Sequence, residues 1–292
     1  MNIIKKKRFY YLGHSFRKDN KVVYREKYLG KEVPGNITEI KTAFLEACRQ
    51  EGVFKKLKWI QKNFQEEWKR YPESIKKKVL VDLSIDFTYN SNAIEGSTIT
   101  LDETEDLIKQ KISPHKPLKD VQETINHSKV FLQALNGKKS LSLGLILEWH
   151  QQLFNDTKSD ISGRLREYLV RVGSYLAPDW QDLPGLLKDY FKWCVKNNKT
   201  MNPVELAARA HYKFEKIHPF GDGNGRVGRL IIAYTLRKHS YPLLTIEYKK
   251  RKSYYHALSK TEEDFVNYFI RRYLNYHKKY LRNAPVVSDQ LN

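Results

Sequence analysis

The stretch from His218 to Arg229 reads HPFGDGNGRVGR and combines glycines with residues that handle charge. Three of the glycines, Gly221, Gly223 and Gly225, fall where a predicted loop meets an apolar helix. Backbone N–H groups in the first turn of a helix have no internal partners, and the helix dipole favours negative charge there. Glycines also let a phosphate chain approach the backbone closely. The stretch therefore predicts an anion site that suits phosphates.

Four ionisable side chains in the same stretch add chemistry to this anion site. Arg226 and Arg229 lie three residues apart, so they share one helix face and supply cations to it. Asp222 would repel a bare phosphate, and we therefore expect it to hold a Mg²⁺ ion that bridges two phosphates. His218 precedes the anion site, and an imidazole with an ordinary pKa of about 6.5 can accept a proton from an incoming nucleophile.

The stretch fills every specified position of the signature His-Pro-Phe-x-(Asp/Glu)-Gly-Asn-Gly-Arg-x-x-Arg, so the chain resembles the Fic proteins. The resemblance implies an all-helical core with a short β-hairpin flap. It also implies transfer of AMP from ATP to a Ser, Thr or Tyr hydroxyl of a target protein, with ATP as substrate and Mg²⁺ as the metal. In this scheme His218 deprotonates the hydroxyl, which attacks the α-phosphorus of ATP and expels pyrophosphate.

The resemblance assigns the remaining signature residues to the nucleotide. Asp222 is the implied Mg²⁺ ligand, Arg226 faces the leaving pyrophosphate and Arg229 holds the γ-phosphate. Tyr254 and Tyr255 lie in a segment that resembles the helix closing over the adenine, where their rings stack on or border the base. The nucleotide-binding set implied in this way is Asp222, Gly223, Asn224, Gly225, Arg226, Val227, Gly228, Arg229, Tyr254 and Tyr255.

A second resemblance concerns the flap. Gly163-Arg-Leu-Arg166, followed by Val170-Arg-Val-Gly173, is similar to the family segment whose exposed backbone pairs with the target protein as an added strand. The target-binding residues implied are Val170, Arg171, Val172 and Gly173. An ordinary structural hairpin is the alternative interpretation.

A third resemblance concerns regulation. Ser91-Asn-Ala-Ile-Glu95-Gly96 is similar to the Ser/Thr-x-x-x-Glu-Gly/Asn inhibitory motif of one class of Fic proteins, so Ser91, Glu95 and Gly96 are the implied inhibitory residues. A carboxylate directed at Arg229 would form a bidentate pair and occupy the place that the γ-phosphate needs. The same glutamate would position a water for removal of AMP. The alternative is a glutamate near a helix end that pairs with any nearby cation.

The remaining patterns predict a mainly α fold. Segments 9–12 and 22–25 indicate strands around a turn, and Thr100-Leu-Asp-Glu103 has the spacing of a capping box. Apolar residues recur at helical spacing from Asn36 onward, apart from a β-rich island at 168–172. The predicted segments are a small basic β appendage at 1–35, a helical region with the inhibitory motif at 36–140, the Fic catalytic core at 141–282 and a tail at 283–292.

Composition limits the partners and the compartment. The net charge is +20, and residues 1–80 hold 21 Lys and Arg against 9 Asp and Glu. This surplus is either a solvated basic surface or a contact for a polyanion such as nucleic acid. With two cysteines and no apolar run near the roughly 20 residues that cross a bilayer, we expect a cytoplasmic protein without disulfides or membrane contact.

The sequence leaves several alternatives open. A non-enzymatic basic regulator that binds nucleic acid through its N-terminus is one, although it would leave His218 without a purpose. A Fic enzyme with another donor, such as UTP, GTP or a phosphocholine carrier, is another. A Walker-type ATPase is excluded, because the sequence has no Gly-x-x-x-x-Gly-Lys-Ser/Thr. Besides the target protein, auto-modification and a homodimer are the expected interactions.

Overall fold

The computed structural model describes residues 1–18, 21–137 and 139–281, which form two compact units. The first unit is Met1–Phe64 together with the chain from His277, and the second is Gln65–Tyr276. The predicted tail at 283–292 lies outside the described residues. The predicted segments 1–35, 36–140 and 141–282 divide the chain by role and stay a prediction.

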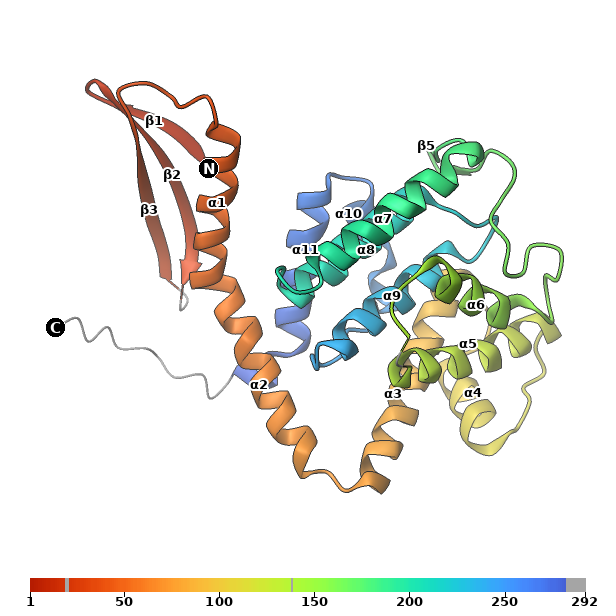
Figure 1. Cartoon of the computed structure of the whole chain (residues 1–292). Helices are drawn as coiled ribbons and strands as arrows, with labels where there is room; N and C mark the ends of the chain where they lie inside the picture. The colour runs from red at the N-terminus through yellow and green to blue at the C-terminus, as the bar shows by residue number, and fades with distance from the viewer. Residues whose placement is uncertain (19–20, 138, 282–292) are drawn as a thin grey trace. The chain divides into compact units, whose positions relative to one another are not determined.

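The first unit is a three-stranded antiparallel sheet with a helix along one face (Figure 1). Its strands follow one another in the order β1 (Asn2–Lys6), β2 (Phe9–Lys18) and β3 (Lys21–Gly30). Helix α1 (Ile37–Arg49) packs on β2, where Leu12 meets Phe44 and Cys48 in a small core. The two strands predicted from sequence are confirmed and longer than expected. Strand β1 was not predicted, because its residues are mostly exposed and pairing with β2 organises it.

The chain continues through a π-helical turn into α2 (Lys55–Arg70), as the uninterrupted helical spacing predicts. The boundary between the two units falls inside α2. Pro72 separates α2 from the next helix. It is the residue just before the first turn of that helix, a position that the fixed φ of proline suits.

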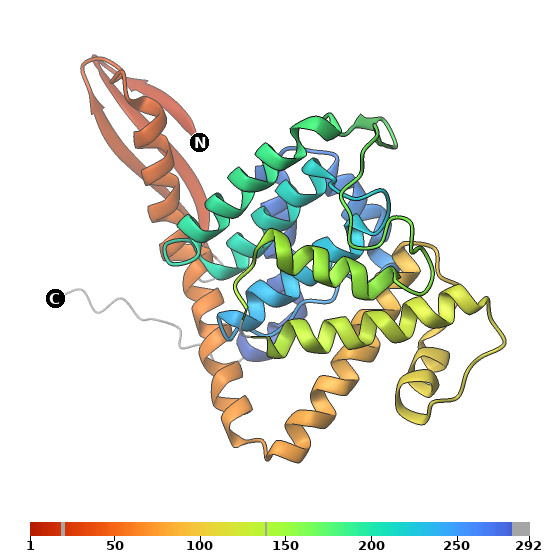
Figure 2. The same cartoon turned by 45° about the vertical axis from the view of Figure 1, so that its right-hand side comes forward.

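The second unit is helical, and the predicted mainly α fold is confirmed. Helix α9 (Asn224–Lys238) is its centre, with α3, α5, α6 and α8 around it (Figures 1 and 2). Its residues from Val227 to Ala233 are almost fully buried, as expected for a helix that is apolar on nearly every side. The surrounding helices are α3 (Glu73–Ile94), α4 (Leu101–Glu105), α5 (Leu118–Asn136), α6 (Leu143–Phe154), α7 (Leu183–Asn197), α8 (Pro203–Ile217), α10 (Arg251–Leu258) and α11 (Glu262–Tyr276).

Local signals in this unit act as the sequence predicts. Thr100 accepts a hydrogen bond from the Glu103 backbone N–H at 3.2 Å, and the Glu103 carboxylate accepts one from the Thr100 N–H at 2.8 Å. The β-rich island forms a hairpin of β4 (Arg171–Val172) and β5 (Tyr175–Leu176). In the described ranges, no helix has both the length and the apolar character needed to cross a membrane.

Candidate active site

His218 ends α8 in a left-handed conformation, with φ 51° and ψ 60°. Its Nδ1 lies 3.3 Å from the backbone carbonyl oxygen of Glu215. Because a carbonyl oxygen only accepts hydrogen bonds, Nδ1 carries the imidazole proton and Nε2 is left as the proton acceptor. Burial lowers the pKa of His218 below its ordinary value, so the ring is neutral at pH 7. The geometry and the charge state both suit a general base.

The loop after His218 is closed by Asn224. The Asn224 side chain accepts a hydrogen bond from the Phe220 N–H at 2.9 Å and donates one to the Phe220 carbonyl at 2.8 Å. Gly223 takes φ 80°, and a Cβ atom there would lie 2.3 Å from the Phe154 ring. The Asn224 side chain therefore closes the loop. Only the backbone N–H of Asn224 takes no part in this closure.

His150, which sequence reasoning missed, ties this loop to the segment before the flap. Its ring stacks on Phe220, with centroids 3.9 Å apart. Nδ1 accepts a hydrogen bond from the Gly163 N–H at 3.0 Å, and Nε2 donates to the Asp222 carbonyl at 3.0 Å. Burial lowers the pKa of His150 to about 4, so it acts as a neutral link. Nothing in its local sequence distinguishes it from a core histidine on α6.

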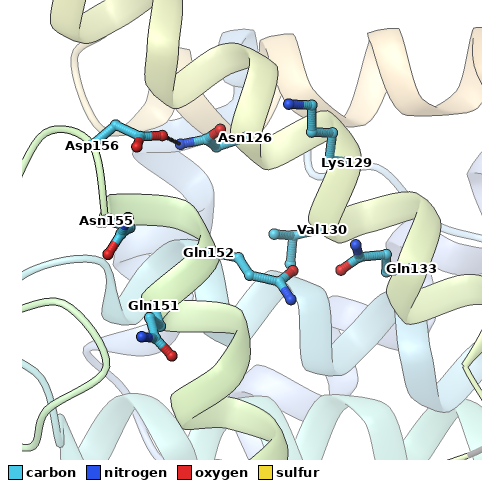
Figure 3. A pocket seen from close by; sticks show the side chains of 8 residues that line it. All are labelled: Asn126, Lys129, Val130, Gln133, Gln151, Gln152, Asn155 and Asp156. Atoms are coloured by element: carbon cyan, nitrogen blue, oxygen red, sulfur yellow. Dashed lines mark hydrogen bonds between the residues drawn. The ribbon is translucent and has the colours of Figure 1, made fainter.

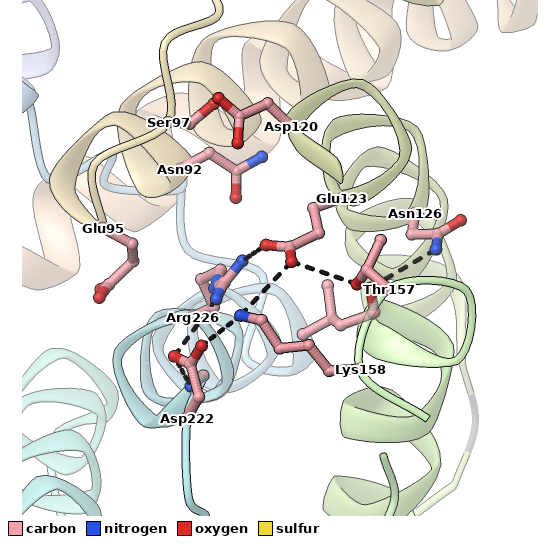
Figure 4. Close-up of polar contacts among 12 residues, drawn as sticks. Asn92, Glu95, Ser97, Asp120, Glu123, Asn126, Thr157, Lys158, Asp222 and Arg226 are labelled. Carbon is pink, nitrogen blue, oxygen red and sulfur yellow. Dashed lines mark hydrogen bonds and ion pairs between the residues drawn. The ribbon is translucent and has the colours of Figure 1, made fainter. Parts of the chain in front are cut away.

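Asp222 belongs to a network of four charges (Figure 4). Its carboxylate contacts Lys158, and it lies 3.4 Å from an Arg226 nitrogen. Glu123 of α5 contacts Arg226 and lies 3.4 Å from Lys158. Although burial raises the pKa of Asp222, Arg226 and Lys158 together lower it to about 2, so the carboxylate is ionised. Sequence reasoning did not find Glu123 or Lys158.

The Asp222 carboxylate fits the protein ligand of a Mg²⁺ ion, and such an ion would replace Lys158, which contacts the carboxylate. No cluster of three or more His, Cys, Asp or Glu that could hold a metal occurs in 1–18, 21–137 or 139–281. Mg²⁺ commonly uses one or two carboxylates, with waters and substrate phosphates as the other ligands. The Asp222 side chain is ionised and 42% exposed, which meets the need for one accessible carboxylate.

Arg229 faces the end of α3, where the predicted inhibitory residues lie. Its Nε donates to the Ser91 hydroxyl at 2.8 Å, and Nη2 donates to the Ser91 carbonyl at 2.9 Å. Nη2 also donates to the Glu95 carboxylate at 2.7 Å. The Glu95 contact uses one nitrogen, and the expected bidentate pair is not formed. Nη1 is buried and has no hydrogen-bond partner within the described part of the chain.

The Glu95 carboxylate lies over the first turn of α9. A Cβ atom at Gly225 would lie 2.3 Å from Glu95 Oε1 and 3.0 Å from Arg229 Nη1. Gly96 follows with φ 94°, which lets the chain turn away directly after Glu95. The carboxylate thus sits where a helix N-terminus favours an anion, on a glycine that leaves room for it.

The other residues expected at the nucleotide lie at different depths. Val227 is fully buried in the core, and Gly228 packs against α8, where a Cβ atom would lie 2.6 Å from Glu215 Oε1. Tyr254 is 1% exposed, and its hydroxyl lies 2.7 Å from His211 Nε2. Tyr255 is 45% exposed. Helical spacing alone does not tell which of the two adjacent tyrosines is buried.

The flap hairpin is fastened to the catalytic loop by Arg166. This side chain is 3% exposed, and its guanidinium donates to three backbone carbonyls. They belong to His218 at 2.8 Å, Tyr168 at 2.7 Å and Pro178 at 2.6 Å. Both ends of the hairpin are therefore tied to the residue that carries the predicted base. Val172 on β4 and Leu176 on β5 are about half exposed.

A separate cavity lies between α5 and α6 (Figure 3). It contains none of the predicted site residues. Five amide side chains dominate its lining, and Asn126 also donates to Asp156 at 3.0 Å beside the Glu123 network. The lining residues are Asn126, Lys129, Val130, Gln133, Gln151, Gln152, Asn155 and Asp156.

Comparison with known proteins finds a family match within the second unit. Residues 140–236 match the Fic/DOC family. A protein adenylyltransferase Fic from Drosophila melanogaster is 31% identical over 188 residues, which are 63% of this chain and 38% of that protein. The protein of the same name from Nematostella vectensis is 30% identical over 202 residues, which are 67% of this chain and 47% of that protein. This chain thus spans less than half the length of these curated relatives.

Solved structures share the fold. Fic-1 from C. elegans, covering its residues 134–508, has a TM-score of 0.69 at 24% identity, over 85% of this chain and 78% of that chain. A Fic family protein from Desulfovibrio desulfuricans has a TM-score of 0.64 at 25% identity, over 80% of this chain and 77% of that chain. With the signature inside the matched segment, residues 140–236 of this chain form a Fic/DOC domain.

Proposed function

We propose that this chain is a protein adenylyltransferase, which transfers AMP from ATP to a Ser, Thr or Tyr hydroxyl of a protein. The observation that supports it best is the arrangement around His218, whose Nε2 is a neutral proton acceptor beside the N-terminus of α9. The name of the curated relatives, protein adenylyltransferase Fic, supports the same reaction.

The proposed reaction is a displacement at the α-phosphorus. His218 Nε2 takes the proton of the target hydroxyl as its oxygen bonds to phosphorus, and the bond to the departing pyrophosphate breaks. Asp222 would hold a Mg²⁺ ion, which would neutralise phosphate charge when bound, and Arg226 offsets the charge of the leaving group. Arg229 binds the γ-phosphate, and its unpaired Nη1 is a donor for that purpose. We assign the exposed ring of Tyr255 to the adenine, because Tyr254 is buried.

We further propose that Glu95 restrains the resting protein. It contacts Arg229 and lies over Gly225, so a γ-phosphate and the Glu95 carboxylate compete for one place. Two like charges repel there, and ATP binds in a productive pose only after Glu95 leaves. A partner protein or a change of oligomeric state would provide the release. The same carboxylate would hold a water for hydrolysis of the AMP–protein bond, which would release AMP and restore the target hydroxyl.

Transfer and restraint can be tested together. The protein is incubated with labelled ATP and Mg²⁺, and incorporation is followed for wild type, Glu95→Gly and the Glu95→Gly/His218→Ala double variant. We expect strong auto-modification of Glu95→Gly, weak labelling of wild type and none of the double variant. Mass spectrometry then distinguishes an added AMP from UMP, GMP or phosphocholine.

The matched control is Glu32→Gly, which removes an exposed glutamate in the first unit and should label like wild type. Equal labelling of wild type and Glu95→Gly would contradict the restraint but leave the transfer intact. Labelling that survives His218→Ala would contradict the assignment of the base. Loss of bound AMP from the labelled protein, by wild type and not by Glu95→Gly, is the expected sign of removal.

A further inference from the structure

One face of the sheet in the first unit carries no helix among the residues that the structure describes. Leu12 points to α1, so its neighbours in β2 point to the opposite side. The register pairs Tyr11 with Ile4 and Tyr28 on that side. The Tyr24 side chain covers Gly13, because a Cβ atom at Gly13 would lie 2.2 Å from the Tyr24 hydroxyl. The larger side chains on this side, here called the outer sheet face, are Ile4, Lys6, Phe9, Tyr11, Tyr24, Glu26 and Tyr28.

The outer sheet face presents aromatic rings to solvent. Tyr28 is 56% exposed and Tyr24 is 50% exposed. Tyr28 contacts Phe9 and Tyr11 edge to face, with centroids 5.8 and 5.5 Å away. Lys6 lies over the Tyr11 ring, 5.5 Å from its centroid. Exposed clusters of large rings are uncommon on surfaces that bind nothing.

The segment that forms the sheet is strongly basic. Residues 1–35 hold 10 Lys and Arg against 3 Asp and Glu. In the described part of this segment the exposed acidic side chains are Glu26 and Glu32, and Glu26 already pairs with Lys6 at 2.6 Å. Among the exposed basic side chains, Lys6 lies on the outer sheet face, and Lys7, Arg8 and Lys31 lie just beyond the strand ends near Phe9 and Tyr28, whereas the register places Lys5, Lys21, Arg25 and Lys27 on the α1 side. The net charge of this segment therefore favours an anionic partner.

We propose that the outer sheet face binds single-stranded nucleic acid, with Tyr24 and Tyr28 stacking on bases and the cations at the strand ends, Lys7, Arg8 and Lys31, on phosphates. Flat rings with flanking cations are how proteins bind single strands without strict sequence preference. An acidic protein would use the cations but leave the rings without a role. A duplex keeps its bases stacked on one another, so it too would leave the rings idle. The inference is independent of nucleotidyl transfer.

The test is binding of the full chain to a labelled oligothymidylate of about 16 nucleotides, the upper site size of such surfaces. We expect Tyr24→Ala and Tyr28→Ala each to weaken binding by roughly tenfold. Tyr24→Phe and Tyr28→Phe keep the ring and should bind like wild type, which separates stacking from folding. Circular dichroism of each variant checks that the sheet is intact.

Charge is tested with a matched pair. Lys7→Gln/Arg8→Gln should lower the slope of log Kd against log salt by about 0.7 for each phosphate that the protein no longer neutralises, whereas Lys77→Gln/Lys78→Gln on α3 should not. Equal binding of the folded alanine variants and wild type would overturn the proposal. So would a preference for the duplex form of the same oligonucleotide, or displacement by polyglutamate as effective as by unlabelled oligothymidylate.

Discussion

At the scale of single residues, the state of His218 decides the chemistry. Its Nδ1 proton is fixed by the Glu215 carbonyl, and burial lowers its pKa below the ordinary value of about 6.5. The neutral ring is the form that accepts a proton. The base is therefore fully available at neutral pH, and it is lost only as the pH falls through a value below 6.5.

The corresponding prediction is a pH profile for the Glu95→Gly protein. We expect the single-turnover rate of auto-modification to be level around neutral pH and to fall in acid, with its midpoint below about 6.5 because burial disfavours the charged imidazole. ATP affinity measured at each pH shows whether the fall belongs to binding or to the proton transfer. A midpoint above 6.5, with ATP binding unchanged, would contradict a buried neutral base.

At the scale of elements, Arg166 joins the flap to the catalytic loop. Three partly buried backbone carbonyls accept from its guanidinium, and a carbonyl that is fully buried costs about 1–3 kcal/mol if left without a donor. We expect Arg166→Met, made in the Glu95→Gly protein, to slow transfer by roughly tenfold or more, because a misplaced target hydroxyl reacts slowly. ATP affinity should change little, since this side chain contacts the flap and not the α9 N-terminus.

Arg164→Met is the control for this prediction, because Arg164 is an exposed arginine two residues away. Arg166→Lys should restore little, since an ammonium group cannot donate along the three directions of the planar guanidinium. A rate equal to that of the Arg164 variant would show that the flap is held by other contacts. A parallel loss of ATP affinity would assign Arg166 to the nucleotide instead.

Elements and site differ in how far sequence predicts them. Helix ends follow from local patterns such as the capping box at Thr100. The predicted anion site lies within one continuous stretch, 218–229, so local sequence is enough to find it. Glu123 and Arg226 are 103 residues apart, and no local pattern links them. Asn224 was expected at phosphates, but its side chain is used to close the loop, a role that depends on the folded backbone. Strand β1 is likewise defined by its partner strand.

At the scale of the whole molecule, charge and chemistry are divided between the two units. Residues 1–64 hold 16 Lys and Arg against 6 Asp and Glu, which is half of the net +20 in less than a quarter of the chain. Glu95, Asp222, Arg229 and the flap all lie within Gln65–Tyr276. The hydrogen bonds that Glu95, Arg166 and His150 make at the candidate active site also stay inside that second unit. The division predicts that nucleotide binding and polyanion binding can be separated.

A chain reduced to 65–276 would show this separation. We expect it to fold, because its core around α9 is complete and Trp68, retained at its start, still stacks with Arg237 at 5.2 Å. In the Glu95→Gly form it should bind ATP with the affinity of the full chain, whereas its affinity for oligothymidylate should fall to that of any weakly basic protein. Circular dichroism and the two binding titrations measure this. If ATP affinity fell with that for the oligonucleotide, the first unit would contribute to the nucleotide site, and the two activities would be coupled rather than carried side by side.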